Sequence, residues 1–130
     1  MTAAFIIEGD ACTDWPATVA EFNRVFASCW KGHPWTGNFD SLNDLLTWIN
    51  GGIGPCDIYW KHAAHARTSL GYPATAAWLS DKFHSAPVGS QAAKEWQKEL
   101  THAGKQKGPT LFARVLELMQ AHEHLEVALG

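Results

Sequence analysis

The sequence predicts an α/β fold in a single domain, with a small three-stranded parallel sheet packed by helices. A short apolar run at residues 3–8 suits a strand buried on both faces, and the runs at 55–61 and 125–129 predict two further short strands. Helical patterns separate these runs, and strands that are joined through helices pair in parallel. The length of 130 residues fits one domain, and a hydrophobic content of 46% is enough for one core.

The first half of the chain predicts a strand followed by two helices. The strand over residues 3–8 ends at a Gly-Asp pair, and a helix follows over residues 15–27. Asp14 is placed to cap the first amides of that helix, and its apolar stripe consists of Val19, Phe22 and Phe26. A loop with two tryptophans, residues 28–37, leads to the next helix.

The clearest helical pattern lies over residues 39–50. Its apolar face is formed by Leu42, Leu45, Leu46 and Ile49, and two glycines at 51 and 52 supply a stop signal. Its opposite face is polar and consists of Asp40, Asn43, Asp44 and Thr47. We expect this polar face to be exposed to solvent.

The segment over residues 63–109 differs in composition from the rest of the chain. It is rich in Ala, Lys and Gly, and it predicts an inserted pair of helices over residues 74–83 and 90–103. A Gly- and Pro-containing turn ends the insert. A last helix over residues 110–121 then precedes the third strand.

The formal net charge of −3 conceals an uneven distribution. Residues 1–60 contain seven acidic and two basic side chains, residues 61–110 three acidic and seven basic ones, and residues 111–130 three acidic and one basic. An acidic chain is not expected to bind nucleic acid directly, because phosphate binding requires a basic surface. Acidic ends instead favour association with a basic partner.

Neither a membrane span nor a signal peptide is expected. No apolar run approaches the ~18–20 residues of a membrane helix, and no Lys or Arg precedes the first apolar run. The three cysteines, Cys12, Cys29 and Cys56, are an odd number without a close pair. Such a pattern indicates reduced thiols and a cytoplasmic location.

The histidines and cysteines do not form a recognisable catalytic or metal-binding motif. His62 and His65 are three residues apart, and His122 and His124 are two apart, but neither pair is completed by a second pair at zinc-site spacing. Cys29 has no neighbouring base in the sequence. We therefore predict no metal, no cofactor and no enzymatic activity.

Asp40 and Asp44 are the residues that most require an explanation. Their spacing of four places two like charges on one helical face, which costs about 0.2–0.5 kcal/mol. Proteins keep such local conflicts most often where function requires them. The pair predicts contact with a basic pocket of the kind that a ribonuclease offers to phosphates. An alternative is that the two carboxylates form the acid–base pair of a small hydrolase.

Residues 35–46, WTGNFDSLNDLL, resemble the binding loop and second helix of the barstar family of intracellular ribonuclease inhibitors. The strand over residues 55–61 and the segment over residues 110–130 are similar to the corresponding parts of that family. The resemblance implies a barstar-like sheet, here with a longer insert at 63–109, in a single domain over 1–130. It also implies a partner-binding surface of Trp35, Thr36, Gly37, Asn38, Asp40, Asn43, Asp44, Thr47 and Glu117.

By this resemblance, the chain is expected to be an immunity protein. It would bind and occlude the active site of a toxin nuclease, a ribonuclease above all, as a monomer in a 1:1 complex without a cofactor. An interaction module that uses the basic insert, with Trp78 and Trp96, is a second alternative beside the small hydrolase.

Overall fold

The computed structural model describes residues 3–52 and 54–130 and shows an α/β fold around a three-stranded parallel sheet. Strands β1 (Ala3–Glu8), β2 (Cys56–Lys61) and β3 (Leu125–Leu129) lie side by side in the order β1-β2-β3. In the register, Phe5 pairs with Ile58, and Ile58 pairs with Val127. The predicted fold class is confirmed, and all three strands lie where the apolar runs predicted them.

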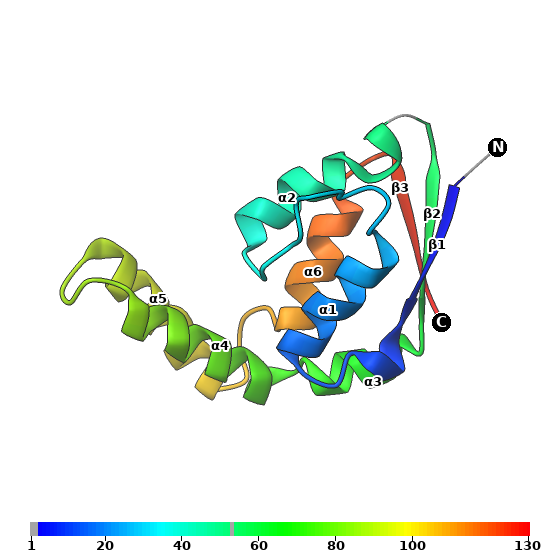
Figure 1. Ribbon diagram of the computed structural model, residues 1–130. Coiled ribbons are helices and arrows are strands. Elements are labelled where there is room, and N and C mark those ends of the chain that lie inside the picture. Colours follow the sequence, from blue (N-terminus) through cyan, green and yellow to red (C-terminus); the bar gives the residue numbers. More distant parts are fainter. Residues whose placement is uncertain (1–2, 53) are drawn as a thin grey trace.

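Helices cover one face of the sheet (Figure 1). They are α1 (Trp15–Val25), α2 (Phe39–Thr47), α3 (Ala63–Ser69), α4 (Tyr72–Ser85), α5 (Gln91–Gly104) and α6 (Leu111–Gln120), with short 3₁₀ turns η1 (Gly9–Ala11) and η2 (Ile49–Gly52). The expectation that the first strand is buried on both faces is wrong. Ile6 and Tyr59 are 58% and 42% exposed, because the described helices leave the other face of the sheet open.

The helices predicted over residues 15–27, 39–50 and 110–121 are confirmed, with shorter ends. Asp14 caps α1 as predicted, since its Oδ1 accepts a hydrogen bond from the N–H of Ala17 at 2.7 Å. The second helix ends earlier than predicted because the backbone turns left-handed at Asn50 and Gly51, with φ of 54° and 65°.

The segment over residues 63–109 contains three helices where the sequence predicted two. The two predicted helices correspond to α4 and α5, which form a helical hairpin that projects from the body (Figure 1). The missed helix is α3. Its Ala63 and Ala66 and the following Leu70 are buried in the core of the body. The projecting part of this segment is therefore the α4–α5 hairpin alone.

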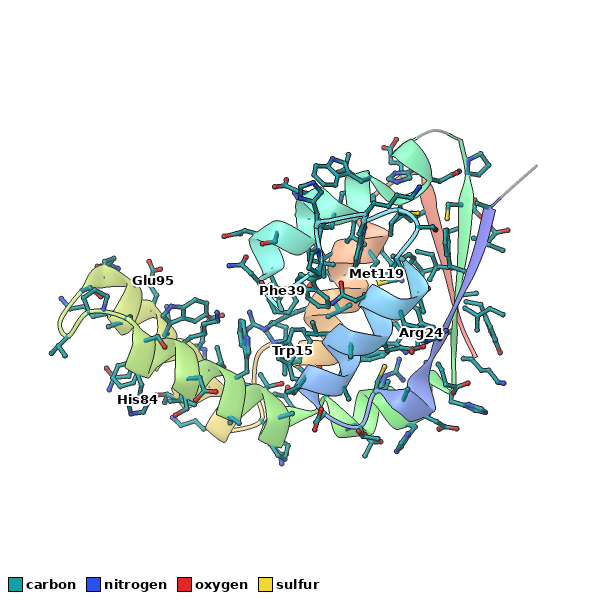
Figure 2. All side chains as sticks on the ribbon, in the orientation of Figure 1. Trp15, Arg24, Phe39, His84, Glu95 and Met119 are labelled. Atoms are coloured by element: carbon teal, nitrogen blue, oxygen red, sulfur yellow. The ribbon has the colours of Figure 1, made fainter. Side chains whose placement is uncertain are left out.

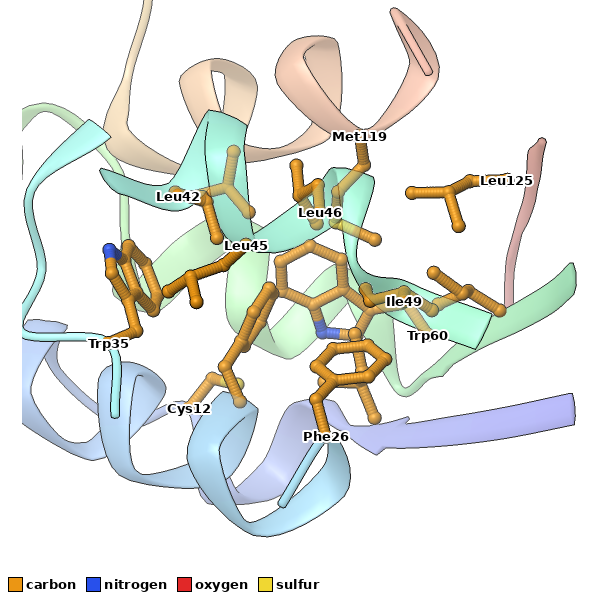
Figure 3. Close-up of a cluster of buried hydrophobic side chains, with 14 of the residues drawn as sticks. Cys12, Phe26, Trp35, Leu42, Leu45, Leu46, Ile49, Trp60, Met119 and Leu125 are labelled. Atoms are coloured by element: carbon orange, nitrogen blue, oxygen red, sulfur yellow. The ribbon is translucent and has the colours of Figure 1, made fainter. Parts of the chain in front are cut away.

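The core lies between the sheet and helices α1, α2 and α6, and it combines aliphatic side chains with a cluster of aromatic rings (Figure 3). Trp60 of β2 is fully buried, with its ring centroid 5.5 Å from that of Phe22 and 4.9 Å from that of Phe112. Aromatic side chains bury the largest apolar areas, so this cluster provides much of the driving force for packing helices on the sheet.

In the parts of the chain that the structure describes, no helix has the length and apolar character of a membrane span.

The carboxyl ends of β1 and β2 are held together by close backbone packing. Glu21 of α1 is buried, and its Oε2 accepts a hydrogen bond from the N–H of Glu8 at 2.8 Å. Burial alone would raise the pKa of Glu21, but hydrogen bonds from Arg24 and from the Glu8 amide outweigh it and hold that pKa below its usual range. Beyond Glu8, Gly9 packs directly against the carbonyl oxygen of His62.

Replacing Gly9 with alanine should destabilise the fold, because the added Cβ would lie 2.1 Å from the backbone oxygen of His62. Overpacking of this kind usually costs about 1–3 kcal/mol, and here the obstructing atoms belong to the backbone and cannot rotate away. Urea unfolding of Gly9→Ala should show a lower midpoint than that of the unchanged chain.

The matched control is Gly104→Ala at the end of α5, where an added Cβ meets no atom within 4 Å. Alanine is favoured over glycine in helices, so this variant should lose no stability. Equal urea midpoints for Gly9→Ala and Gly104→Ala would contradict the close packing of Gly9 against the carbonyl oxygen of His62.

Candidate functional site

The loop that precedes α2 is anchored by the side chain of Asn23. Its Oδ1 accepts a hydrogen bond from the N–H of Trp35, and its Nδ2 donates to the carbonyl oxygen of Trp35, both at 2.8 Å. The indole N–H of Trp35 in turn donates to the carbonyl oxygen of Asn38 at 2.8 Å. Between them, Gly37 has a φ of 98° and packs against Trp15, a position that suits only glycine. These contacts fix the path of the chain into α2.

Helix α2 begins where Asn38 caps it. The Oδ1 of Asn38 accepts hydrogen bonds from the N–H groups of Asp40 and Ser41 at 2.8 and 3.1 Å. The leucines of α2 at 42, 45 and 46 are buried in the core. As predicted, the opposite face is exposed, and it presents Asp40, Asn43, Asp44 and Thr47.

A groove of about 800 Å³ lies where α2 and α6 meet the α4–α5 hairpin. The residues that line it are Asn38, Phe39, Asp40, Asn43, Asp44, Trp78, Lys82, Trp96, Pro109, Arg114, Glu117, Leu118 and Ala121. Figure 2 shows Phe39 at the junction between the body and the hairpin, near Trp15. We call this feature the α2–hairpin groove.

Five of the nine predicted site residues line the α2–hairpin groove: Asn38, Asp40, Asn43, Asp44 and Glu117. The last of these comes from α6, so the fold brings together acidic residues that are more than seventy positions apart in the sequence. Thr36 and Gly37 precede the groove and do not line it. Thr47 is exposed at the far end of α2, where its hydroxyl donates to the carbonyl oxygen of Asn43 at 3.2 Å.

The prediction that Trp35 faces a partner is corrected by its burial. Only 1% of its surface is exposed, and its ring packs against those of Trp15 and Phe22 at centroid distances of 5.4 and 5.5 Å. A buried indole with a satisfied N–H gains more from packing than an exposed one. Trp35 therefore supports the loop from inside and offers no contact surface.

The carboxylates of the groove carry charge that the chain does not neutralise. Asp40, Asp44 and Glu117 are exposed, and within residues 3–52 and 54–130 none of them forms an ion pair. The ion pairs of the described chain involve other acids. The groove therefore presents three negative charges without a counter-charge in direct contact.

The two basic side chains of the groove are engaged by an aromatic ring. Lys82 Nζ and Arg114 Cζ each lie 5.6 Å from the ring centroid of Trp78, a distance typical of cation–π contacts. Arg114 also forms an ion pair with Glu99 of α5, with Nη2 and Oε1 3.0 Å apart. Neither cation is held against the groove's own carboxylates.

The aromatic wall of the groove comes from the hairpin. The hairpin belongs to the insert that the alternative hypothesis of an interaction module assigns to partner binding. Trp78 and Trp96 are half-buried and pack edge to face, with centroids 5.6 Å apart, and Trp78 contacts Phe39 of α2 at 5.3 Å. The two tryptophans therefore pack against each other and still line the groove. Tryptophans in an otherwise Lys- and Ala-rich insert are the sequence signal for this wall.

Asn43 is held at the edge of the groove by the residues that follow α6. Its Oδ1 is hydrogen bonded to the Nε2 of His122 at 3.1 Å. Burial, and then the nearby His124, lower the pKa of His122, so this ring stays neutral at neutral pH. The contact fixes the amide of Asn43 beside Asp44.

The two buried cysteines are unsuited to act as nucleophiles. Burial raises the pKa of Cys12 and Cys56 to about 11, which keeps both thiols protonated at neutral pH. Cys12, Cys29 and Cys56 are all free, and Cys29 is partly exposed.

Replacing Asp44 with asparagine should stabilise the isolated protein slightly. The change removes the like-charge pair with Asp40 one turn away, which is worth about 0.2–0.5 kcal/mol, and Asp and Asn have similar helix propensities. Urea unfolding at low ionic strength should show the gain, and 1 M salt should reduce it.

Asp81→Asn is the matched control, because Asp81 is an exposed acid of α4 with no acidic residue four positions away. It should show no gain. A stabilisation equal to that of Asp44→Asn would mean that the effect comes from net charge and not from the pair on α2.

Comparisons of the chain with protein-family models, with curated proteins and with solved structures return no match. The function of the α2–hairpin groove therefore has to be inferred from its own chemistry and from the resemblance of residues 35–46.

Proposed function

We propose that this chain is an intracellular immunity protein that binds and occludes the active site of a toxin nuclease, with a ribonuclease as its target. The observation that carries the proposal is the set of three exposed carboxylates, Asp40, Asp44 and Glu117, in one groove without an ion pair among the described residues. A nuclease active site is lined by basic groups that bind phosphate. The carboxylates would take the place of the phosphates of the substrate.

The shape of the groove supports a complex in which the target inserts a basic element. Trp78 and Trp96 form a wall beside the carboxylates, and apolar walls exclude water from a filled groove. Charge pairs gain strength when water is excluded, and a cation of the target would also find the exposed part of an indole ring. Aromatic side chains at the centre of an interface commonly contribute most of its binding energy.

The resemblance of residues 35–46 to the barstar family supports the same assignment. It implies a 1:1 complex of a monomeric inhibitor, without a cofactor and without turnover. The three free cysteines fit the reducing conditions of the cytoplasm, which is the location we propose.

Truncating Asp44 should weaken binding to the cognate toxin. Removing one partner of a buried charge pair at an interface generally costs about 2–5 kcal/mol, which corresponds to a rise in Kd of roughly thirtyfold or more. The measurement is calorimetric titration of Asp44→Ala, and of Asp40→Ala, against a toxin ribonuclease that the unchanged chain binds.

Asp81→Ala serves as the control, because it removes one exposed acid from outside the groove and leaves the net charge equal to that of Asp44→Ala. It should bind as tightly as the unchanged chain. Unchanged affinity of Asp44→Ala would refute this site assignment. Turnover of an RNA or ester substrate by the purified protein, lost in Asp44→Ala, would favour the small-hydrolase alternative instead.

The insert over residues 63–109 also carries exposed lysines, and this observation favours an interaction module that uses the insert. These are Lys94, Lys98, Lys105 and Lys107, none of which lines the groove. A variant with all four changed to glutamate should keep protection against the toxin within a fewfold of the original, because binding is assigned to the groove. Loss of toxin binding in this variant, with Asp44→Ala unaffected, would instead assign the interface to the basic face of the insert.

A further inference from the structure

Two acids and two histidines converge at the carboxyl ends of β1 and β2. Glu8 ends β1, Asp10 lies in η1, His62 follows β2, and His65 lies in α3. We call these four residues the strand-end cluster. None of them lines the α2–hairpin groove.

The strand-end cluster brings donor atoms of three side chains close enough together to surround one metal ion. His62 Nδ1 lies 2.7 Å from Glu8 Oε1 and 3.0 Å from Asp10 Oδ2, and His65 Nδ1 lies 3.2 Å from Asp10 Oδ1. Donor atoms of Glu8, Asp10 and His62 all lie within 4.8 Å of one another. Ligand bonds of ~2.0–2.2 Å to zinc place neighbouring tetrahedral donors ~3.3–3.6 Å apart. An ion would therefore require only small side-chain displacements.

The backbone holds the two halves of the strand-end cluster in place. Gly9, between Glu8 and Asp10, packs directly on the carbonyl oxygen of His62. His62 itself has left-handed backbone angles, with φ of 51° and ψ of 42°, which turn its ring towards the end of β1. A set of donors that is fixed before an ion binds loses little entropy on binding.

The chemistry of the donors favours a ligand site. Imidazole combined with carboxylate suits zinc, whereas magnesium and calcium prefer oxygen donors alone. Lys61 Nζ approaches the other oxygen of Glu8, Oε2, at 3.7 Å, which leaves Oε1 directed at His62.

We propose that the strand-end cluster binds one zinc ion through His62, Glu8 and Asp10, with His65 holding the second carboxylate oxygen of Asp10 from outside the ligand set. The histidine spacing in the sequence does not reveal this site, because its acidic ligands lie more than fifty residues upstream. The site is independent of the proposed inhibitor function, since it shares no residue with the groove.

The test is calorimetric titration of untagged protein, stripped with a chelator, with ZnCl₂ and separately with MgCl₂. We expect saturable binding of one zinc ion per chain, a higher Tm with zinc, and no comparable response to magnesium. His62→Asn should weaken zinc binding at least tenfold and lose the rise in Tm. Asparagine is chosen because it tolerates left-handed backbone angles.

His102→Ala is the control, since it removes an exposed histidine of α5 and should bind zinc like the original chain. Asp10→Asn and His65→Ala decide the question if His62→Asn does not fold, and both should also weaken binding. Absence of saturable zinc binding would overturn the proposal. So would equal zinc affinity in the folded cluster variants and His102→Ala, or magnesium binding as tight as zinc binding.

Discussion

The pair of hydrogen bonds between Asn23 and the backbone of Trp35 determines where the polar face of α2 points. The Asn23 side chain satisfies both the N–H and the C=O of Trp35. These two hydrogen bonds hold the loop against α1. Each such bond contributes about 0.5–1.5 kcal/mol net, and the burial of the Trp35 ring adds to it. Because Asn38, the cap of α2, also accepts the indole N–H, the start of the helix follows directly from this anchor.

The second wall of the groove depends on how the base of the hairpin is fixed. Thr75 of α4 is fully buried, and its hydroxyl donates to the carbonyl oxygen of Gly71 while accepting the N–H of Leu111, the first residue of α6. The Tyr72 hydroxyl donates to the carbonyl oxygen of Gly108 at 2.8 Å. These bonds tie α4 to the start of α6, and the contact between Trp78 and Phe39 ties it to α2. The groove is thus built on rigid elements, which favours a defined partner orientation.

The strands and the amphipathic helices can be predicted because their signals are local. The apolar runs place β1 and β3 correctly, and the leucine pattern of α2 is enough to identify the acids on its exposed face. Helix α3 is missed because it lacks a side-chain cap and an apolar stripe of large residues. Its helical form depends on burying Ala63 and Ala66 against the core.

The sequence does not reveal the contacts that assemble the groove and the strand-end cluster, because the residues in contact are far apart along the chain. No local pattern shows that Asn23 will hold Trp35, or that Trp78 will meet Phe39. An exposed aromatic loop residue and a buried one have the same sequence signature, so the sequence wrongly predicts a surface position for Trp35. Likewise, the acids of the strand-end cluster meet its histidines only because β1 and β2 pair in parallel and end at the same edge.

The charge arrangement in the groove argues for selection of a partner more than for stability of the free chain. If Lys82 and Arg114 were paired with the groove's acids, the isolated protein would gain a few tenths of a kcal/mol per exposed pair. Trp78 and Glu99 engage these cations instead. The three carboxylates then repel polyanions and attract cations, and a basic target would supply the missing counter-charge upon binding. Under the proposed function, the like-charge pair on α2 would be a cost to the free protein that lets its surface discriminate a basic protein from a nucleic acid.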